Sequence, residues 1–375
     1  MAGTTIFTVM TALAEETGAV NLGQGFPDED GPSAIVDAAV EAMRAGHNQY
    51  APLPGVPALR HAIADHQRRH YGIELDPDAE VQVTFGVTEA LAAAVLALVG
   101  EGDEVAVLDP AYDSYEPVVG LAGGTVRRIP LRPPGWRVEA AAVADAVTPR
   151  TRVLLLNSPH NPTGRVFDTG ELELLAEACR ANDLVALTDE VYEHLVYDGR
   201  HVPPATLPGM RERTITVSSL GKTHSLTGWK VGWASGPAEL IGRVRGVKQF
   251  LTFAGGTPFQ HAAAAGLELP ATELVEELRS KRDRLSAALA ECGFGVLESA
   301  GTYFLNADAA PLGEEDAAAL CMRLPHEAGV VAIPVSAFSA ETEGPLRPIV
   351  RFAFCKSDEV LDEGIARLRA WAEAR

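Results

Sequence analysis

The sequence is poor in positive charge and in cysteine. Its 375 residues include 31 Lys and Arg against 51 Asp and Glu, so the formal net charge is -20. This balance disfavours a surface for nucleic acid or for anionic membranes, and small molecules are the expected partners. The four cysteines, at positions 179, 292, 321 and 355, show no C-x-x-C spacing. They are therefore predicted to be buried reduced thiols rather than disulfides or zinc ligands.

Long hydrophobic runs are also missing. The longest, ALAAAVLALV over residues 90–99, is too short to cross a bilayer. The first basic residue is Arg44, so the N-terminus lacks the positive region of a secretory signal. These two features predict a cytoplasmic protein with no nucleic-acid or membrane partner.

Short apolar segments alternate with longer helical patterns between about residues 80 and 250. This alternation predicts an α/β fold built on a mostly parallel, doubly wound sheet. The seven candidate strands span residues 81–85, 104–109, 125–131, 152–157, 184–189, 214–219 and 230–235.

The pattern changes after Pro270. A long amphipathic helix over residues 271–292 precedes three strand-like segments and a closing helix from about Asp358. The strand-like segments are GTYFLNAD (301–308), VAIPVSAF (331–338) and PIVRFAFC (348–355). We therefore expect a large domain over residues 41–270, and a smaller α+β domain made of residues 271–375 together with an N-terminal segment, 1–40.

Polar and small residues follow four of the predicted strands where each strand ends. Gly86, Val87 and Thr88 follow the predicted strand 81–85, and Asn161 follows the strand 152–157. Asp189 and Tyr192 lie at the end of the strand 184–189, and Ser219 and Lys222 at the end of the strand 214–219. Each could be a simple turn or cap residue. In open α/β sheets, however, ligands bind at the carboxyl edge. Their convergence on that edge predicts one binding site.

The chemistry of these residues favours a phosphorylated cofactor. A helix beginning at about Thr88 offers free N–H groups to a phosphate, and Ser219 and Lys230 could complete the anion site. The chain has no G-x-x-x-x-G-K-[ST], and GQGFPDEDG departs from G-x-G-x-x-G, which disfavours ATP and nicotinamide dinucleotides. Pyridoxal phosphate needs an Asp for its ring nitrogen, a Tyr and an Asn for its phenolic oxygen, and a Lys for a Schiff base. All four types follow the predicted strands.

Several longer motifs occur in order along nearly the whole chain. They are GAVNLGQGFPDEDGP, NQYAPLPGVPALR, LNSPHNPTG, TDEVYEHLVYDG, SSLGKTHSLTGWKVGW and VRFAFCK. In these motifs the chain resembles the fold-type I, class I/II pyridoxal-phosphate-dependent aminotransferases. Within them it looks most like the kynurenine, glutamine and methionine aminotransferases and their bacterial N-succinyldiaminopimelate aminotransferase relatives. The resemblance implies a large cofactor-binding domain with a seven-stranded sheet, a small α+β domain and a homodimer.

The resemblance also implies roles for the cofactor-binding residues. Lys222 corresponds to the Schiff-base lysine, and Asp189 to the partner of the pyridine nitrogen. Tyr192 and Asn161 correspond to the groups that bind the phenolic oxygen, and Tyr112 to the aromatic ring that stacks on the cofactor. The residues at phosphate-binding positions are Gly86, Val87, Thr88, Ser219 and Lys230, with Tyr50 reaching the phosphate from the other subunit.

For the substrate, the resemblance implies that Arg351 binds the α-carboxylate together with Asn161. Alternation with its phenylalanine neighbours would instead make Arg351 an outward-facing strand residue. Gly25 corresponds to a position where the backbone approaches the substrate closely. The side-chain pocket is implied to include Phe7, Phe253 and Phe338.

This implied pocket is apolar and offers no second arginine for a dicarboxylic donor. We therefore expect neutral apolar or aromatic donors, such as methionine, phenylalanine, kynurenine or glutamine, and a 2-oxo acid acceptor in a ping-pong reaction. Two alternatives stay open. One is N-succinyldiaminopimelate, with a distal cation such as Arg132 or Lys248. The other is cysteine-S-conjugate β-lyase activity on the same scaffold.

Three histidines are read as structural. His66 and His70 are four residues apart, but no H-E-x-x-H surrounds them and their segment is highly charged. A solvated helix face is the favoured interpretation, and no metal site is expected. For His224, two residues after Lys222, a contact with the site and a local hydrogen bond are equally good explanations, and it is not placed among the catalytic residues.

Overall fold

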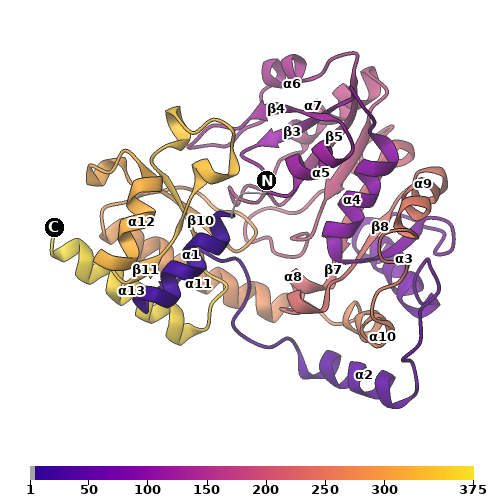
Figure 1. Cartoon of the computed structure of the whole chain (residues 1–375), viewed down its shortest axis with the longest axis horizontal. Coiled ribbons are helices and arrows are strands. Elements are labelled where there is room, and N and C mark those ends of the chain that lie inside the picture. Colours follow the sequence, from indigo (N-terminus) through magenta and orange to yellow (C-terminus); the bar gives the residue numbers. More distant parts are fainter. Residues whose placement is uncertain (1–4) are drawn as a thin grey trace.

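The larger part of the chain is built on one seven-stranded sheet, as Figure 1 shows for the computed structural model, which describes residues 5–375. The strand order is β2-β8-β7-β6-β5-β3-β4, and only β8 runs antiparallel to its neighbours. The strands are β2 (Val81–Phe85), β3 (Glu104–Asp109), β4 (Thr125–Pro130), β5 (Thr151–Asn157), β6 (Val185–Asp189), β7 (Thr214–Ser219) and β8 (Val231–Ser235). The predicted α/β fold with a mostly parallel sheet is confirmed, and every predicted strand end is correct to within one residue.

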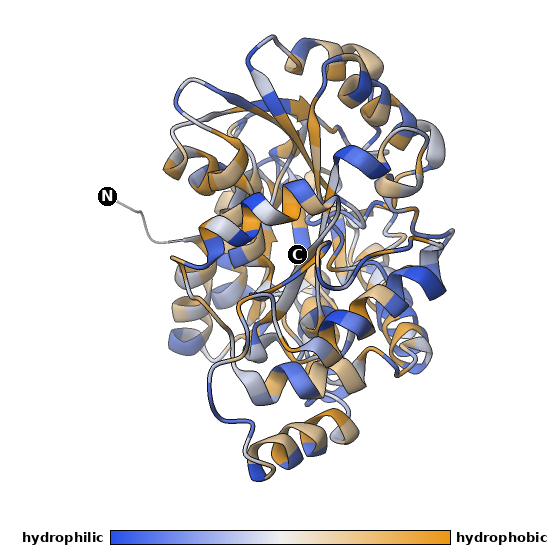
Figure 2. Ribbon diagram, turned by 90° about the vertical axis from the view of Figure 1, so that its right-hand side faces the viewer, coloured by the Kyte–Doolittle hydropathy of each residue, from blue (hydrophilic) through white to orange (hydrophobic). Residues whose placement is uncertain are grey.

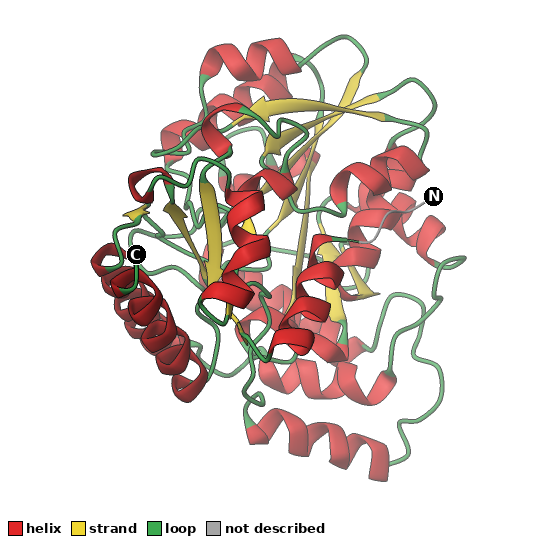
Figure 3. Cartoon of the chain, turned by 60° about the vertical axis from the view of Figure 1, so that its left-hand side comes forward, coloured by secondary structure: helices red, strands yellow, loops and turns green. Residues whose placement is uncertain are grey.

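Helices cover both faces of this sheet, because the strands are apolar on both sides. In β3, Val105 and Val107 pack into one apolar cluster while Ala106 and Leu108 pack into another on the opposite face. The first cluster includes α4 (Gly86–Leu98), α5 (Tyr115–Leu121) and α9 (Ala238–Lys248); the second includes α6 (Ala140–Ala146) and α7 (Thr169–Ala181). Figure 3 shows helices on either side of the strands.

A third apolar cluster covers the end of the sheet formed by β2 and β8. It contains α2 (Ser33–Arg44), α3 (Pro57–Tyr71) and α10 (Thr257–Gly266). Ile35 and Ala39 of α2 are buried there, and α2 lies beside α10 in Figure 1. The predicted domain boundary between residues 40 and 41 falls within α2, and the buried residues Ile35 and Ala39 of this helix pack with helices of the large domain. The sequence analysis did not identify this amphipathic helix.

The rest of the chain forms a second apolar core around an antiparallel sheet of order β12-β13-β10-β9. Its strands are β9 (Gly295–Val296), β10 (Phe304–Asp308), β12 (Ile333–Pro334) and β13 (Ile349–Ala353). Its helices are α11 (Thr272–Glu291), α12 (Ala317–Glu327) and α13 (Asp358–Glu373). The N-terminal α1 (Ile6–Thr17) packs here, and β1 (Val20–Asn21) pairs in parallel with β11 (Val330–Val331).

One predicted strand in this part is too long. Residues 331–338 do not form a single strand, because Val335–Phe338 adopt a 3-10 helix, η5, after Pro334. Pro334 has no backbone N–H to extend the ladder. The remaining short helices are α8 (Leu220–Thr223), η1 (Pro204–Thr206), η2 (Arg211–Arg213), η3 (Thr227–Trp229), η4 (Ala310–Leu312) and η6 (Gly344–Leu346).

The burial of the cysteines agrees with the sequence-based prediction. All four are buried and none is in a disulfide. Figure 2 shows orange, apolar strands in the interior and helices of mixed hydropathy around them. Within residues 5–375, no helix combines the length and the apolarity needed to span a membrane.

Candidate active site

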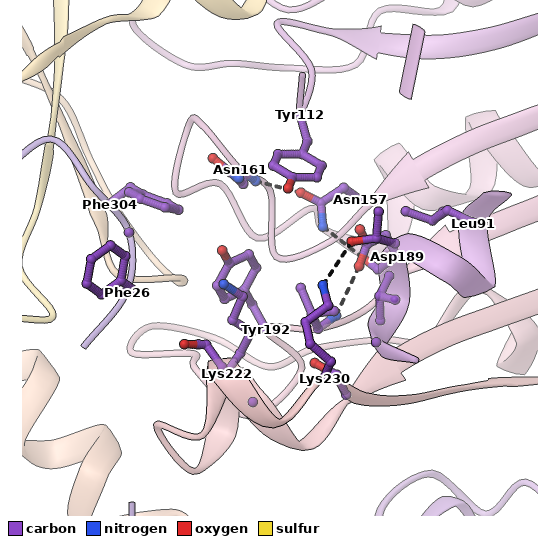
Figure 4. Close-up of a pocket in the computed structure, with 18 of the residues that line it drawn as sticks. Phe26, Leu91, Tyr112, Asn157, Asn161, Asp189, Tyr192, Lys222, Lys230 and Phe304 are labelled. Atoms are coloured by element: carbon purple, nitrogen blue, oxygen red, sulfur yellow. Dashed lines mark hydrogen bonds between the residues drawn. The ribbon is translucent and has the colours of Figure 1, made fainter. Parts of the chain in front are cut away.

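A cavity of about 340 Å³ opens at the carboxyl edge of the large sheet, facing β10 and β13. Figure 4 shows Tyr112, Asn161, Asp189, Tyr192 and Lys222 pointing into it from different segments. Phe26 and Phe304 lie on one side of the cavity, and Asp189 and Lys230 on the other. The predicted site residues that line it are Phe7, Gly25, Gly86, Val87, Thr88, Tyr112, Asn161, Asp189, Tyr192, Ser219, Lys222, Lys230 and Arg351.

Lys222 lies on α8, directly after β7, and its amine enters the cavity. The amine Nζ donates a hydrogen bond to Tyr303 Oη at 2.9 Å, and the Tyr303 hydroxyl donates to the Gly25 carbonyl at 2.6 Å. Burial lowers the pKa of the Lys222 amine. A lowered pKa increases the unprotonated fraction of the amine, and only the unprotonated form can act as a nucleophile or accept a proton.

Lys230 and the start of α4 form an anion-binding corner. The first turn of α4 has no side-chain cap, so its N–H groups remain available to a ligand. Lys230 Nζ donates to Thr88 Oγ1 at 3.3 Å, and Lys230 adopts a left-handed φ of 53°. Gly86 has a φ of 71°, and a Cβ there would lie 2.9 Å from Lys230 Cε. Close backbone approach and a strained lysine are features of a functional site rather than of a surface turn.

Asp189 lies at the end of β6 and is buried. Its carboxylate accepts hydrogen bonds from Tyr115 Oη at 2.8 Å and from the Val191 N–H at 3.3 Å. Within residues 5–375 no Lys, Arg or His forms a salt bridge with it. Burial raises the pKa of Asp189 to about 6. A protonated nitrogen placed against this carboxylate would supply the cation it lacks.

Arg351 reaches the cavity from β13 and is only 1% exposed. Its Nη1 donates to Asn161 Oδ1 at 2.9 Å, its Nη2 donates to the Gly23 carbonyl at 3.1 Å, and its Nε has no partner among residues 5–375. Burial lowers the pKa of Arg351 to about 10, so the guanidinium stays charged at neutral pH. The alternation-based interpretation of an outward-facing arginine is wrong, because β13 is buried on both faces.

The contact with Arg351 also orients Asn161. A guanidinium can only donate, so the oxygen of the Asn161 amide must face it. The amide nitrogen is then free to donate a hydrogen bond to an anionic oxygen in the cavity. Asn157, at the end of β5, supports this loop by accepting from the Asn161 N–H at 2.7 Å and donating to the Asp189 carbonyl at 2.8 Å.

Two of the predicted pocket residues, Phe253 and Phe338, do not line this cavity, and neither does Tyr50, which was predicted to act at the phosphate of the other subunit. Tyr50 and Phe253 are 84% and 43% exposed and contact each other edge to face, with ring centroids 5.8 Å apart. Phe338 lies behind the cavity, with its ring 4.5 Å from the Arg351 guanidinium. Phe7 packs against Phe338 and does line the cavity.

The two possible distal cations also lie outside the cavity. Lys248 is buried and donates to the Phe253 carbonyl at 2.6 Å, while Arg132 forms an ion pair with Glu341 at 2.6 Å. Both are therefore already engaged within their own chain.

Sequence analysis missed several residues that build the site. Tyr303 holds the Lys222 amine, Phe304 stacks at 3.9 Å on the Arg351 guanidinium, and Tyr115 holds Asp189. A Cβ on Gly25 would lie 2.4 Å from Phe304 Cζ, so the position is crowded by the protein itself, and the predicted approach of the substrate to Gly25 stays a prediction. Tyr115 and Asn157 adjoin predicted strand ends and could have been found there, whereas the partners of Tyr303 are far away in sequence.

The prediction of a solvated face for His66 and His70 is wrong for His66. His66 is 2% exposed, because the segment after β6 covers it and brings His194 Nε2 to 2.7 Å from His66 Nε2. His70 is exposed. His224 is buried and lines a separate cavity with these histidines.

The cavity fits pyridoxal phosphate. An uncapped helix start with Lys230 and Thr88 suits the phosphate, and the buried Asp189 carboxylate suits a protonated ring nitrogen. A buried lysine of lowered pKa suits covalent attachment of the aldehyde.

Comparison with known proteins supports the same chemistry. The family described as "Aminotransferase class I and II" matches residues 17–368. The chain is 53% identical to a probable N-succinyldiaminopimelate aminotransferase of Mycobacterium tuberculosis, covering 99% of this chain and 96% of the relative. It is 43% identical to a methionine aminotransferase of Escherichia coli, covering 98% and 96%. A solved structure of N-succinyldiaminopimelate aminotransferase from Mycobacterium tuberculosis superposes with a TM-score of 0.95 at 53% identity, over 98% of this chain and 97% of that one.

The buried Asp189 generates a prediction about stability. Its folded pKa of about 6 lies above the ordinary value of 3.8. As the pH rises, Asp189 therefore loses its proton at a lower pH in the unfolded chain than in the folded protein. Above pH 6 the ionised Asp189 lowers the free energy of unfolding of the cofactor-free protein by about 3 kcal/mol. We expect Asp189→Asn to be more stable than the wild type without cofactor, by a margin that grows by about 1 kcal/mol or more between pH 5 and pH 8.

Urea unfolding of the cofactor-free proteins at both pH values measures this margin. Asp37→Asn, at an exposed position on α2, is the matched control and should show no such growth. A margin for Asp189→Asn that is independent of pH would contradict the account of the buried carboxylate.

Proposed function

The chain belongs to the class I and II aminotransferase family, and we propose that within this family its amino donor is N-succinyldiaminopimelate. The observation that carries the proposal is the 53% identity to a probable N-succinyldiaminopimelate aminotransferase, which extends over 99% of the chain. The acceptor is a 2-oxo acid, and the two half-reactions alternate at one site.

Aminotransferases of this family use pyridoxal phosphate, which supplies an aldehyde that combines with amines and an electron-poor ring that draws electron density from the substrate Cα. In this proposal Lys222 is the covalent anchor, a role supported by its burial and lowered pKa. Once the substrate amine has taken the place of Lys222, the freed Lys222 amine would carry the proton away from Cα as a positioned general base.

The remaining cofactor contacts are divided among the loops at the sheet edge. Asp189 pairs with the ring nitrogen, Tyr192 and the Asn161 amide nitrogen donate to the phenolic oxygen, and Tyr112 covers the ring face. The phosphate is bound by Gly86, Val87, Thr88, Ser219 and Lys230. This division is supported by the positions of all these residues around one cavity.

Arg351 binds the substrate α-carboxylate in this proposal. The guanidinium is charged, buried and held between Phe304 and Phe338, so a carboxylate can pair with it away from water. Asn161 and the Gly23 carbonyl fix the orientation of the guanidinium. Gly25 has no side chain, so the substrate can lie close to the main chain at this position.

N-succinyldiaminopimelate carries further carboxylates at the distal end of a long chain. Lys222, Lys230 and Arg351 are the cations that line the cavity within residues 5–375, and each already has a role near the reacting centre. Burying a distal carboxylate without a partner would cost several kcal/mol. We therefore place the distal end at the cavity mouth beside Phe26, which is 46% exposed, where water can solvate the carboxylates.

A second candidate donor is a neutral apolar amino acid such as methionine. Phe7, Phe26 and Phe304 line the cavity near Arg351 and offer an apolar surface that such a side chain could fill. The 43% identity to a methionine aminotransferase supports this alternative. The two donors share the same α-carboxylate and cofactor contacts, so only their side chains distinguish them.

Donor choice is tested by kcat/KM for N-succinyldiaminopimelate, methionine, phenylalanine, kynurenine, glutamine and aspartate with 2-oxoglutarate as acceptor. We expect N-succinyldiaminopimelate to exceed every other donor at least tenfold, which corresponds to about 1.4 kcal/mol of transition-state preference. If methionine or another neutral donor leads by that factor, the first proposal fails and the second replaces it.

We also propose that the enzyme is a homodimer with shared sites. Exposed aromatic and aliphatic side chains gather where Tyr50 meets Phe253, and Phe250 and Leu251 in the same segment are exposed as well. Exposed apolar groups of this kind favour contact with another protein surface. A second copy of the chain is the proposed occupant, and it would bring Tyr50 to the phosphate of the partner's site.

Mixing two impaired variants tests the shared site. Each proposed site takes Lys222 from one chain and Tyr50 from the other. In a hybrid of Lys222→Ala and Tyr50→Ala, one of the two sites therefore receives both mutated residues and the other receives neither, so one site is intact. After joint refolding of equal amounts, we expect about a quarter of the wild-type activity. Lys222→Ala mixed with Asp189→Asn is the control and should recover none, because both residues belong to the same chain's cavity. Equal results for the two mixtures would contradict a site completed by Tyr50.

A further inference from the structure

A second cavity, of about 200 Å³, lies on the other side of the segment that carries Lys222. Its wall includes His66 and His70 from α3 and His194 from the segment after β6. The nitrogen atoms that the three imidazoles offer all lie within 4.8 Å of one another. The ring centroids are 4.6 Å apart for His66 and His70, and 4.9 Å apart for each of them and His194. Three imidazoles therefore converge on one point.

A buried carboxylate oxygen beside the histidines is unsatisfied. Glu193 Oε2 has no hydrogen-bond partner among residues 5–375, although Glu193 is only 5% exposed and lines the cavity. Buried polar groups normally find a partner, so an unsatisfied one indicates a bound group. The proposed aminotransfer at the first cavity does not use Glu193.

The charges of these groups suit a cation. Imidazole nitrogens are common ligands of divalent metal ions, and three meet here. The Glu193 carboxylate accepts from Ser218 Oγ through Oε1 at 2.6 Å and leaves Oε2 free. An anionic group next to the histidines would offset part of the charge of a divalent ion.

We propose that His66, His70 and His194 bind a divalent transition-metal ion of the zinc type. Imidazole nitrogens are preferred ligands of Zn²⁺, and His66 and His70, one helical turn apart, present the i, i+4 spacing that binds metal on a helix. Three protein nitrogens leave the fourth tetrahedral position to water from the cavity.

The present spacing needs only small adjustment to accept the ion. Ligand atoms about 2.0 Å from zinc are about 3.3 Å from each other in a tetrahedral site. His66 Nε2 and His194 Nε2 are 2.7 Å apart, so these rings separate slightly as they exchange their mutual hydrogen bond for bonds to the metal. His70 is exposed and can rotate toward the ion without disturbing the core.

The ion would connect α3 to the segment that carries Tyr192. His194 follows Tyr192 by two residues, and Ser219 lines both cavities. Because the three histidines converge only in the folded chain, zinc bound by them should stabilise the folded enzyme.

The test uses untagged holoenzyme, freed of metal with a chelator and then titrated with Zn²⁺ in competition with a chromophoric chelator. We expect one zinc ion per chain, and an affinity at least about tenfold lower in His70→Ala and in His194→Ala. His61→Ala, at an exposed position on the same helix, is the matched control and should bind like the wild type. Zinc should raise the Tm of the wild type and of His61→Ala, and not that of the two ligand variants.

All of these variants keep the cofactor site, so any zinc that binds to the cofactor itself should bind equally to all of them. A difference between the variants therefore reports binding at the histidines. The proposal is overturned if the wild type binds no zinc at micromolar concentration. It is equally overturned if His70→Ala and His194→Ala both bind zinc as tightly as His61→Ala.

Discussion

The active site depends on a carboxylate, Asp189, that the fold removes from water without providing a counter-cation. Asp189 ends β6 in the middle of the large sheet, where strands on both sides shield it, and within residues 5–375 its hydrogen bonds come from a tyrosine hydroxyl and one backbone N–H. In the proposed site, the ring nitrogen of pyridoxal phosphate is the cation that pairs with this carboxylate. The same burial lowers the pKa of the Lys222 amine, so one physical constraint prepares both the partner and the anchor of the cofactor.

Substrate recognition depends on a contact between the two parts of the chain. Arg351 extends from the antiparallel sheet and is oriented by Asn161 from the large sheet edge and by the Gly23 carbonyl from the N-terminal segment. Tyr303 makes a similar connection, because it joins the Lys222 amine to the Gly25 carbonyl. In the proposed site, the side chains assigned to cofactor and substrate thus meet only when the small domain and the N-terminal segment pack onto the large sheet. On this proposal, a donor presents its α-carboxylate at this junction.

Sequence patterns were sufficient for the parts of this account that are local. Most of the strands were predictable because they are short apolar runs between turn residues, and the proposed cofactor ligands were found because several of these runs end in or are followed by polar residues. Contacts between distant segments were not predictable from periodicity. Arg351 alternates with phenylalanines like an exposed residue, yet β13 is buried on both faces. His66 lies in a charged helix, yet the segment carrying His194 covers it. The helix α2 was missed although its apolar residues Ile35, Ala39 and Ala42 recur at helical spacing and are buried, a signal that the sequence did contain.

The central claim is that Lys222, rather than Lys230, is the residue bonded to the cofactor. Borohydride reduction of the holoenzyme, followed by digestion and mass spectrometry, locates the reduced cofactor directly. The account predicts a single modified peptide with the adduct on Lys222, and no adduct when Lys222→Ala is treated in the same way. An adduct on Lys230, or an unchanged yield of modified peptide from Lys222→Ala, would contradict it.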